Sequence, residues 1–301
     1  MGALRAWSLY LGLVVVGGAL LAPWGYWLTQ ESAAYCAWLV PLAHNPFPRF
    51  VHRSLLVLAI AGLCPLLRHL KVRSWREAGL TSLTGQWGRL GAGLALGFGS
   101  LAVVGGIELG CGARGWAASL SGAEVLRHLV NAGGAAVAVA LLEEVLFRGA
   151  LYGTLRRELP WRVALVVSSL VYAWVHFFAP VTWVGPVGWT SGLAALGEML
   201  RGFIQPASLF PTLLNLTLVG AMLALAYQRT GTLCFSMGLH GGWIFWLKSY
   251  GLLTQGLADQ HTWWWGTGKL IDGWLALPAL AAGGWVVSRL VPPRPAPAEV
   301  G

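Results

Sequence analysis

The stretch Gly133–Tyr152 reads GGAAVAVALLEEVLFRGALY, and it decides the fold class. Its length matches the run of about 20 mainly apolar residues that an α-helix needs to cross a bilayer. Glu143, Glu144 and Arg148 interrupt this apolar run. An ionisable side chain at membrane depth costs at least about 2.5 kcal/mol, so such residues are rare and usually functional. The stretch therefore predicts a membrane-spanning helix that carries part of a functional site.

The composition of the whole chain agrees with a membrane protein. Hydrophobic residues make up 56% of the 301 residues and charged residues only 10%, with a mean hydropathy of +0.65. Soluble domains carry about 25% charged residues. We therefore expect an all-α, polytopic integral membrane helical bundle, with residues 1–301 forming a single domain. The net charge of +9 comes from Lys and Arg at the predicted span ends, so it predicts a lipid bilayer as a partner and no nucleic acid.

Apolar runs near spanning length predict about eight transmembrane helices. The runs are Trp7–Leu28, Ser54–Leu70, Leu90–Leu109, Gly133–Leu155, Trp161–Ala179, Ser208–Tyr227, Gly231–Leu253 and Gly273–Val291. The segment Ala33–Leu42 is too short to span and is expected to be re-entrant or interfacial. Residues Lys71–Gly88 combine Trp with charged residues, which is typical of an interfacial segment. The Pro-rich tail, residues 292–301, is expected to be disordered.

The distribution of Lys and Arg predicts the orientation in the membrane. If the N-terminus lies in the cytoplasm, twelve of the 20 Lys and Arg residues fall on the cytoplasmic side and six on the other. Positively charged residues are enriched in cytoplasmic loops. We therefore expect a multi-pass protein of the inner (plasma) membrane with both termini in the cytoplasm.

Two histidines lie inside other predicted spans, at a depth similar to that of the glutamates. At a rise of about 1.5 Å per residue, Glu143 lies roughly 18 Å from the inner end of its span. By the same count His176 lies roughly 22 Å and His240 roughly 14 Å from the inner ends of theirs. Three polar side chains near the middle of the bilayer can face one internal cavity. The pattern therefore predicts that these residues form one site.

Helix geometry predicts different roles for the two glutamates. Glu144 and Arg148 are four residues apart and share a helix face, which suits an ion pair. Glu143 points about 100° away and remains available to accept a proton. With His176 beside it, Glu143 could activate a water molecule, and His240 could donate to a developing oxyanion.

Three other interpretations are open at this point. The Glu144–Arg148 pair could be purely structural. Glu143, His176 and His240 could form the proton path of a transporter, although no repeated halves with broken helices are visible. One Glu and two His could bind zinc, but the chain has no H-E-x-x-H motif and its four cysteines lack metal-ligand spacing. We expect no metal and no cofactor.

These residues resemble the motifs of the CPBP family of intramembrane glutamic proteases, which includes the type II CAAX prenyl endopeptidases. The family pattern is E-E-x-x-x-R, then F-x-x-x-H, then H-x-x-x-N. The first motif matches fully at Glu143–Arg148. The second matches at His176, with Tyr172 in place of Phe, and the third at His240, with Ile244 in place of Asn. The resemblance covers residues 70–253, which it predicts to be the catalytic core.

The resemblance implies a metal-independent endopeptidase that hydrolyses a peptide bond of a membrane-associated protein or peptide. Glu143 and His176 would activate the water, and His240 would help to form the oxyanion hole. Glu144 and Arg148 would hold the site together. A non-catalytic family member that binds a peptide or a lipid-modified partner is the alternative.

Ile244 cannot donate a hydrogen bond, so a working protease needs another donor. Asn215 lies roughly 18 Å from the inner face, at the depth of the motif residues. It is the candidate oxyanion donor, and the indole N–H of Trp243 is a second candidate. In the alternative interpretation, Asn215 only links two helices.

Overall fold

The computed structural model describes residues 2–117, 120–178, 180–204, 206–257, 262–266 and 270–291. These residues are mostly helical, and the strands among them form a two-stranded antiparallel sheet. The expected all-α polytopic bundle is confirmed. The tail that we expected to be disordered, residues 292–301, lies outside the described residues.

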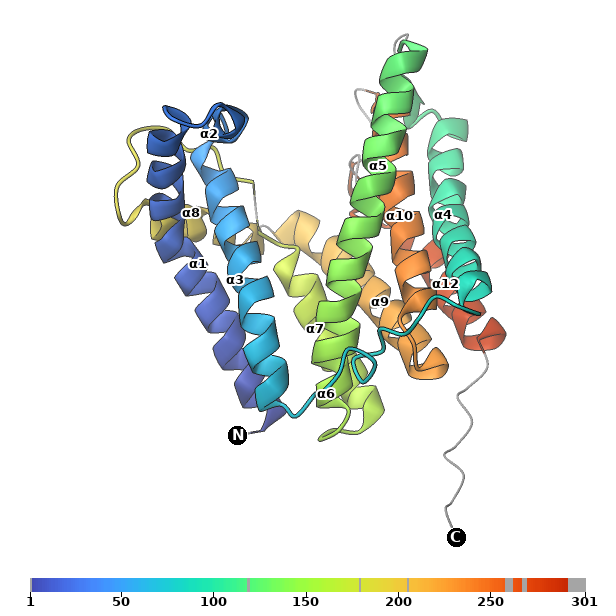
Figure 1. Ribbon diagram of the computed structural model, residues 1–301. Helices are drawn as coiled ribbons and strands as arrows, with labels where there is room; N and C mark the ends of the chain where they lie inside the picture. Colours follow the sequence, from blue (N-terminus) through green and yellow to red (C-terminus); the bar gives the residue numbers. More distant parts are fainter. Residues whose placement is uncertain are drawn as a thin grey trace. The chain divides into compact units, whose positions relative to one another are not determined.

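Figure 1 shows the helices along the chain. They are α1 (Ala3–Ala33), α2 (Val40–Ala43), α3 (Phe47–His69), α4 (Trp87–Gly110), α5 (Gly122–Glu143), α6 (Gly153–Leu155), α7 (Trp161–Val175), α8 (Ser191–Met199), α9 (Pro206–Thr230), α10 (Cys234–Leu253), α11 (Thr262–Trp265) and α12 (Ala276–Leu290). Two short 3₁₀ segments, η1 (Ala37–Leu39) and η3 (Leu200–Ile204), and a π-helix, η2 (Glu144–Tyr152), complete the helical part. Strands β1 (Arg114–Trp116) and β2 (Thr254–Gly256) pair with Gly115 opposite Gln255, so the sheet links the ends of α4 and α10.

Within the described residues, five helices are long and apolar enough to cross a membrane. They cover Ala3–Ala33, Phe47–His69, Trp87–Gly110, Gly122–Leu155 and Phe210–Thr230. The other three predicted spans are helices that are shorter or more polar. Helices α7 and α12 have 15 residues each, about 22 Å of helix. Helix α10 has 20 residues but contains His240 and Lys248.

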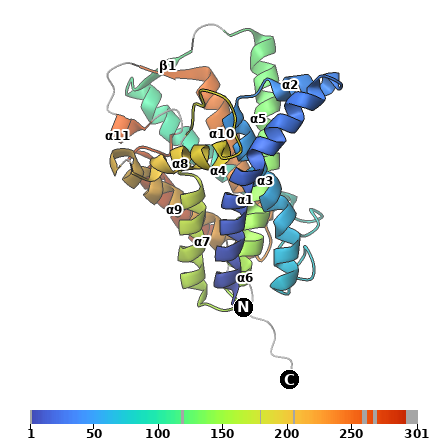
Figure 2. The ribbon, with the colours of Figure 1, turned by 90° about the vertical axis from the view of Figure 1, so that its left-hand side faces the viewer.

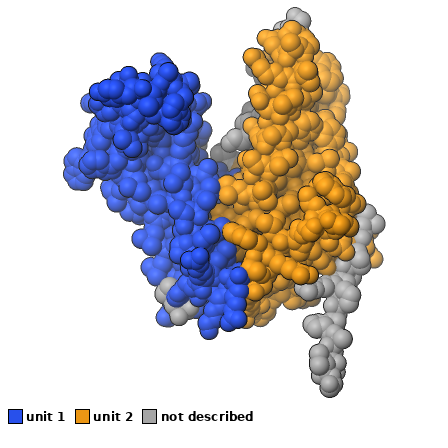
Figure 3. Space-filling model, viewed as in Figure 1, with its two compact units in different colours: residues 1–73, 175–206 blue, residues 74–174, 207–301 orange. Residues whose placement is uncertain are grey.

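The chain divides into two compact units, coloured separately in Figure 3. Unit 1 contains residues 1–73 and 175–206, and unit 2 contains residues 74–174 and 207–301. In unit 1, α1 and α3 lie side by side and α8 packs against both. Its core contains Ala22, Phe47, Phe50, Val51, Ala195 and Met199.

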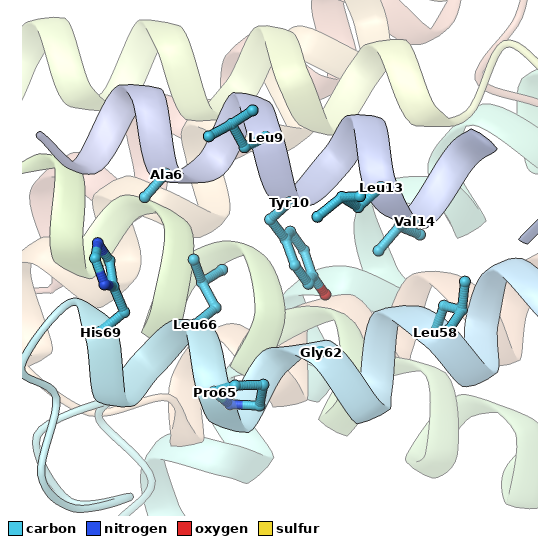
Figure 4. A pocket seen from close by; sticks show the side chains of 10 residues that line it. All are labelled: Ala6, Leu9, Tyr10, Leu13, Val14, Leu58, Gly62, Pro65, Leu66 and His69. Atoms are coloured by element: carbon cyan, nitrogen blue, oxygen red, sulfur yellow. The ribbon is translucent and has the colours of Figure 1, made fainter. Parts of the chain in front are cut away.

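Unit 1 also contains an apolar pocket of about 400 Å³ between α1 and α3 (Figure 4). Ala6 and Gly62, on the two helices, contribute little side-chain volume there. The polar groups of the lining are the hydroxyl of Tyr10, which donates to the Ala59 carbonyl, and the ring of His69. This lining contains no carboxylate side chain.

In unit 2, α10 packs against both α4 and α5 (Figures 1 and 2). Gly93 and Gly97 of α4 and Gly238 and Gly242 of α10 each face backbone atoms of the other helix, with no room for a Cβ. Small residues at such spacing let membrane helices approach closely. This contact fixes the position of α10, which carries His240.

We expect Gly238→Ala to lower the free energy of unfolding by about 1–3 kcal/mol. A Cβ at this position would meet the Leu90 carbonyl and would lie 2.9 Å from the Leu94 nitrogen, and backbone atoms cannot rotate away. Gly99→Ala is the matched control, because a Cβ there meets nothing within 4 Å. Thermal unfolding in detergent measures both variants. If Gly238→Ala and Gly99→Ala are equally stable, the helices α4 and α10 pack less closely than in the structure.

Candidate active site

The helix that carries the glutamates changes its winding at the motif. The regular helix α5 ends at Glu143, and the π-helix η2 begins at Glu144. Turns of π-helix are rare and occur frequently at functional sites. Within η2, Gly149 faces the carbonyl of Ala78 so closely that a Cβ would not fit. The segment before α4 therefore supports the helix that carries the candidate site.

Glu144 is the centre of a buried polar cluster. Its Oε1 atom lies 3.0 Å from Arg148 Nη1 and 3.0 Å from His240 Nδ1. The side chain of Glu144 is fully buried, and Arg148 and His240 are 1% and 5% exposed. The ion pair expected from the spacing of Glu144 and Arg148 is present. The hydrogen bond to His240 was not predicted, and it places the proton of the imidazole on Nδ1, because a carboxylate only accepts.

Arg148 is also held by groups from two other helices. Its Nη2 atom lies 3.5 Å from the Gly220 carbonyl of α9, and its guanidinium stacks 4.3 Å from the ring centroid of Tyr172 in α7. The Tyr172 ring also packs edge-on against Phe147 and contacts the ring of His240. A cation over an aromatic face is stabilised, more so away from water. Tyr172, the aromatic residue of the second motif, therefore packs against the buried cluster. Its position four residues before His176 is the feature of the sequence that indicates a place near the site.

Glu143 has a different environment from Glu144. Its side chain is 22% exposed, and its Oε2 atom lies 3.7 Å from His240 Nε2. That separation is longer than a direct hydrogen bond. The two ring nitrogens of His240 thus face two carboxylates, with Glu144 bonded to Nδ1 and Glu143 opposite Nε2.

His176 lies just beyond the end of α7. The span was expected to continue to Ala179, but the helix ends at Val175 and His176 occupies a turn with an exposed side chain. Pro180 limits how far this helix could continue, since the residue before a proline is disfavoured in helical conformation. His176 belongs to unit 1, whereas Glu143 and His240 belong to unit 2. The contacts described above therefore join four of the five motif residues: Glu143, Glu144, Arg148 and His240. That His176 belongs to the same site stays a prediction.

The two candidates for a replacement oxyanion donor have other partners. The Asn215 side chain is fully buried, and its Nδ2 atom donates to the carbonyls of Ile271, at 2.9 Å, and Gly273, at 2.8 Å. The Trp243 indole N–H donates to the Ser100 hydroxyl at 2.9 Å. Both N–H groups of the amide thus hold the turn before α12, because buried carbonyls need donors. This arrangement agrees with the linking role and leaves Asn215 no N–H for an oxyanion.

We expect Asn215→Leu to lower the free energy of unfolding by about 2–4 kcal/mol, because it leaves two buried carbonyls without a donor. The kcat per folded molecule should stay unchanged. Thr217→Val is the matched control on the same helix, since the Thr217 hydroxyl is buried without a hydrogen-bond partner. Thermal unfolding and the rate per folded molecule measure both variants. If Asn215→Leu instead lowers kcat and leaves the stability unchanged, Asn215 acts as the oxyanion donor.

Residues 126–246 match the family model described as Type II CAAX prenyl endopeptidase Rce1-like. This segment is an Rce1-like domain. It contains all the motif residues, and the match supports a CAAX-type intramembrane protease, that is, a peptide hydrolase. No curated protein and no solved structure matches the chain.

Proposed function

We propose that the Rce1-like domain hydrolyses a peptide bond of a membrane-associated protein or peptide by a glutamate-based mechanism. The observation that carries the proposal is the position of His240 between the carboxylates of Glu143 and Glu144. The buried carboxylate is bonded and orients the ring. The carboxylate of Glu143, whose side chain is 22% exposed, faces the other ring nitrogen.

In the proposed reaction, Glu143 is the general base. Its carboxylate takes a proton from water, and the resulting hydroxide forms a bond to the carbonyl carbon of the substrate. The carbonyl oxygen becomes an oxyanion, to which His240 donates from Nε2 when the ring is protonated. Glu143 then returns its proton to the amide nitrogen, and the C–N bond breaks to give an acid and an amine. His176, which the second motif supplies, would help Glu143 to hold the water.

Glu144 and Arg148 are positioning residues in this proposal. The Glu144 carboxylate accepts from Nδ1 of His240, which turns Nε2 toward Glu143. Arg148 balances the charge of Glu144 inside the bundle.

The proposed hydrolysis needs no metal ion. In the part of the chain that the structure describes, no three His, Cys, Asp or Glu side chains are grouped so as to hold a metal. We expect chelators to leave the activity of the purified protein unchanged and elemental analysis to find no stoichiometric zinc. Stoichiometric zinc, with activity lost to a chelator and restored by zinc, would favour a metalloprotease.

The purified chain reconstituted in liposomes tests the activity itself. Membrane-anchored peptides carrying a fluorophore on each side of the candidate bond report cleavage, and mass spectrometry of the products locates the bond. Binding of such peptides without cleavage would favour the non-catalytic alternative. We further propose that both termini face the cytoplasm in the inner membrane. Protease protection of tags placed at each end measures this orientation.

A further inference from the structure

Unit 2 contains a polar cavity that the proposed hydrolysis does not use. Its volume is about 860 Å³, and hydroxyl and guanidinium groups are prominent in its lining. The cavity lies between the segment that precedes α4 and the residues around the ends of α6 and α9. The lining residues that carry the argument are Ser74, Arg76, Thr84 and Arg156.

The segment that forms one wall of this cavity is held against α9 and α10. The Gly79 carbonyl accepts a hydrogen bond of 2.9 Å from the Leu233 backbone N–H, next to the start of α10. Gly79 has a φ of +83°, and the ring of Tyr227 lies where its Cβ would be. Only glycine fits this conformation and this contact. The wall is therefore a fixed part of unit 2.

The lining has an excess of positive charge. Arg156 is half-buried, stacks on the rings of Tyr227 and Tyr152, and uses its Nη1 atom to bond Gln228 at 3.0 Å. Arg76 is exposed at the rim of the cavity. The acid of the lining, Glu77, lies 3.7 Å from Arg157, which balances its charge.

Two exposed hydroxyl groups of the wall can donate to a ligand. The Ser74 hydroxyl accepts from the Glu77 backbone N–H at 3.2 Å, and the Thr84 hydroxyl accepts from the Ser82 hydroxyl at 3.0 Å. Each of these two oxygens acts as an acceptor in that bond, so its own proton is available to the cavity. They stand beside two guanidinium groups, which favour anions with several acceptor oxygens.

We propose that this cavity binds a phosphate ester. A phosphate group presents acceptor oxygens in several directions, which suits donors that come from different walls of one cavity. The cavity lies on the side predicted to be cytoplasmic, and the exposed Trp75 and Trp87 next to it are typical of the membrane interface. The ester is therefore either the headgroup of an anionic phospholipid or a soluble compound. This site is independent of the proposed hydrolysis.

Binding to the purified full chain in detergent tests the proposal and separates the two sources. The lipid arm compares phosphatidylglycerol with galactosyl diacylglycerol, which lacks phosphate, and the soluble arm compares glycerol 1-phosphate with glycerol. We expect phosphate-bearing ligands to raise the unfolding temperature and to be retained in native mass spectrometry. A response to phosphatidylglycerol alone identifies a lipid site, and a response to glycerol 1-phosphate identifies a site open to soluble esters.

Substitutions in the lining test whether the phosphate ligand binds in this cavity. Arg76→Gln and Arg156→Gln should each weaken binding about tenfold, the loss expected for one charged hydrogen bond. Arg76 is exposed, so its variant keeps the test valid even if Arg156→Gln unfolds. Arg162→Gln is the matched control, because it removes the same charge from an exposed position outside the cavity. The proposal is overturned if neither phosphate ligand binds, or if Arg162→Gln weakens binding as much as Arg76→Gln.

Discussion

Glu143→Gln is expected to abolish peptide hydrolysis and to leave the fold intact. The variant keeps the size of the side chain but removes the group that accepts the proton of the water. A general base contributes about 10²–10⁴ in rate, so kcat should fall by about three orders of magnitude. The fold should survive because the side chain of Glu143 is 22% exposed and is not the carboxylate that pairs with buried Arg148.

The measurement is kcat/KM on a membrane-anchored peptide in liposomes, together with thermal unfolding in detergent. Glu158→Gln is the control, since it makes the same chemical change at an exposed position after α6. The control should be as active as the parent chain. If Glu143→Gln hydrolyses peptide at the parental rate, the glutamate mechanism is wrong.

Local spacing allowed correct predictions in this chain. The apolar run Trp7–Leu28 lies inside α1, and Leu90–Leu109 lies inside α4, because apolar length alone specifies a spanning helix. The Glu144–Arg148 pair followed from the helical repeat. The depth estimates also placed Glu143 and His240 at a similar level, and the structure brings these side chains together.

Contacts between distant segments could not be predicted in the same way. The bond between His240 and Glu144 requires α10 to lie close to α5, which depends on packing of three helices rather than on spacing within one. Asn215 was assigned by depth alone, and its partners lie in a turn 56 residues later in the chain. The helix before His176 ends at Val175, and the apolar run that continues beyond this residue gave no sign of that end.

The division into two units was likewise invisible in the sequence. Each unit is assembled from two separate parts of the chain, and one boundary falls directly after Trp174, within α7. Composition is similarly apolar on both sides of that point, so no linker marks it. Such a division follows from which helices contact one another, and a single sequence holds no direct record of those contacts.

Glu144→Gln and Arg148→Met are each expected to destabilise the protein by about 3–5 kcal/mol, and the double variant by less than the sum. Each single change leaves one buried charge without its partner, whereas the double change leaves none. Residues in one buried network show coupling energies of about 0.5–3 kcal/mol. Thermal and chemical unfolding of the four proteins in detergent measures this coupling.

The exposed pair formed by Arg201 and Glu198 is the control cycle. Its nitrogen and oxygen lie 2.9 Å apart, about as close as in the buried pair, but the side chains are 67% and 43% exposed. Exposed ion pairs contribute at most about 1 kcal/mol. We therefore expect a coupling energy of at most about 1 kcal/mol between Arg201 and Glu198. Because the two pairs have similar distances, burial should account for the difference between the two cycles.

The two single variants in the buried cycle should also differ from each other. When Arg148 is replaced, Glu144 keeps its hydrogen bond to His240. When Glu144 is replaced, Arg148 keeps only weaker partners among the contacts described above, the Gly220 carbonyl at 3.5 Å and the ring of Tyr172. Glu144→Gln should therefore be the more destabilising change, and it should also reduce kcat because His240 loses the acceptor that orients it. Equal or additive losses would show that the three side chains do not act as one cluster.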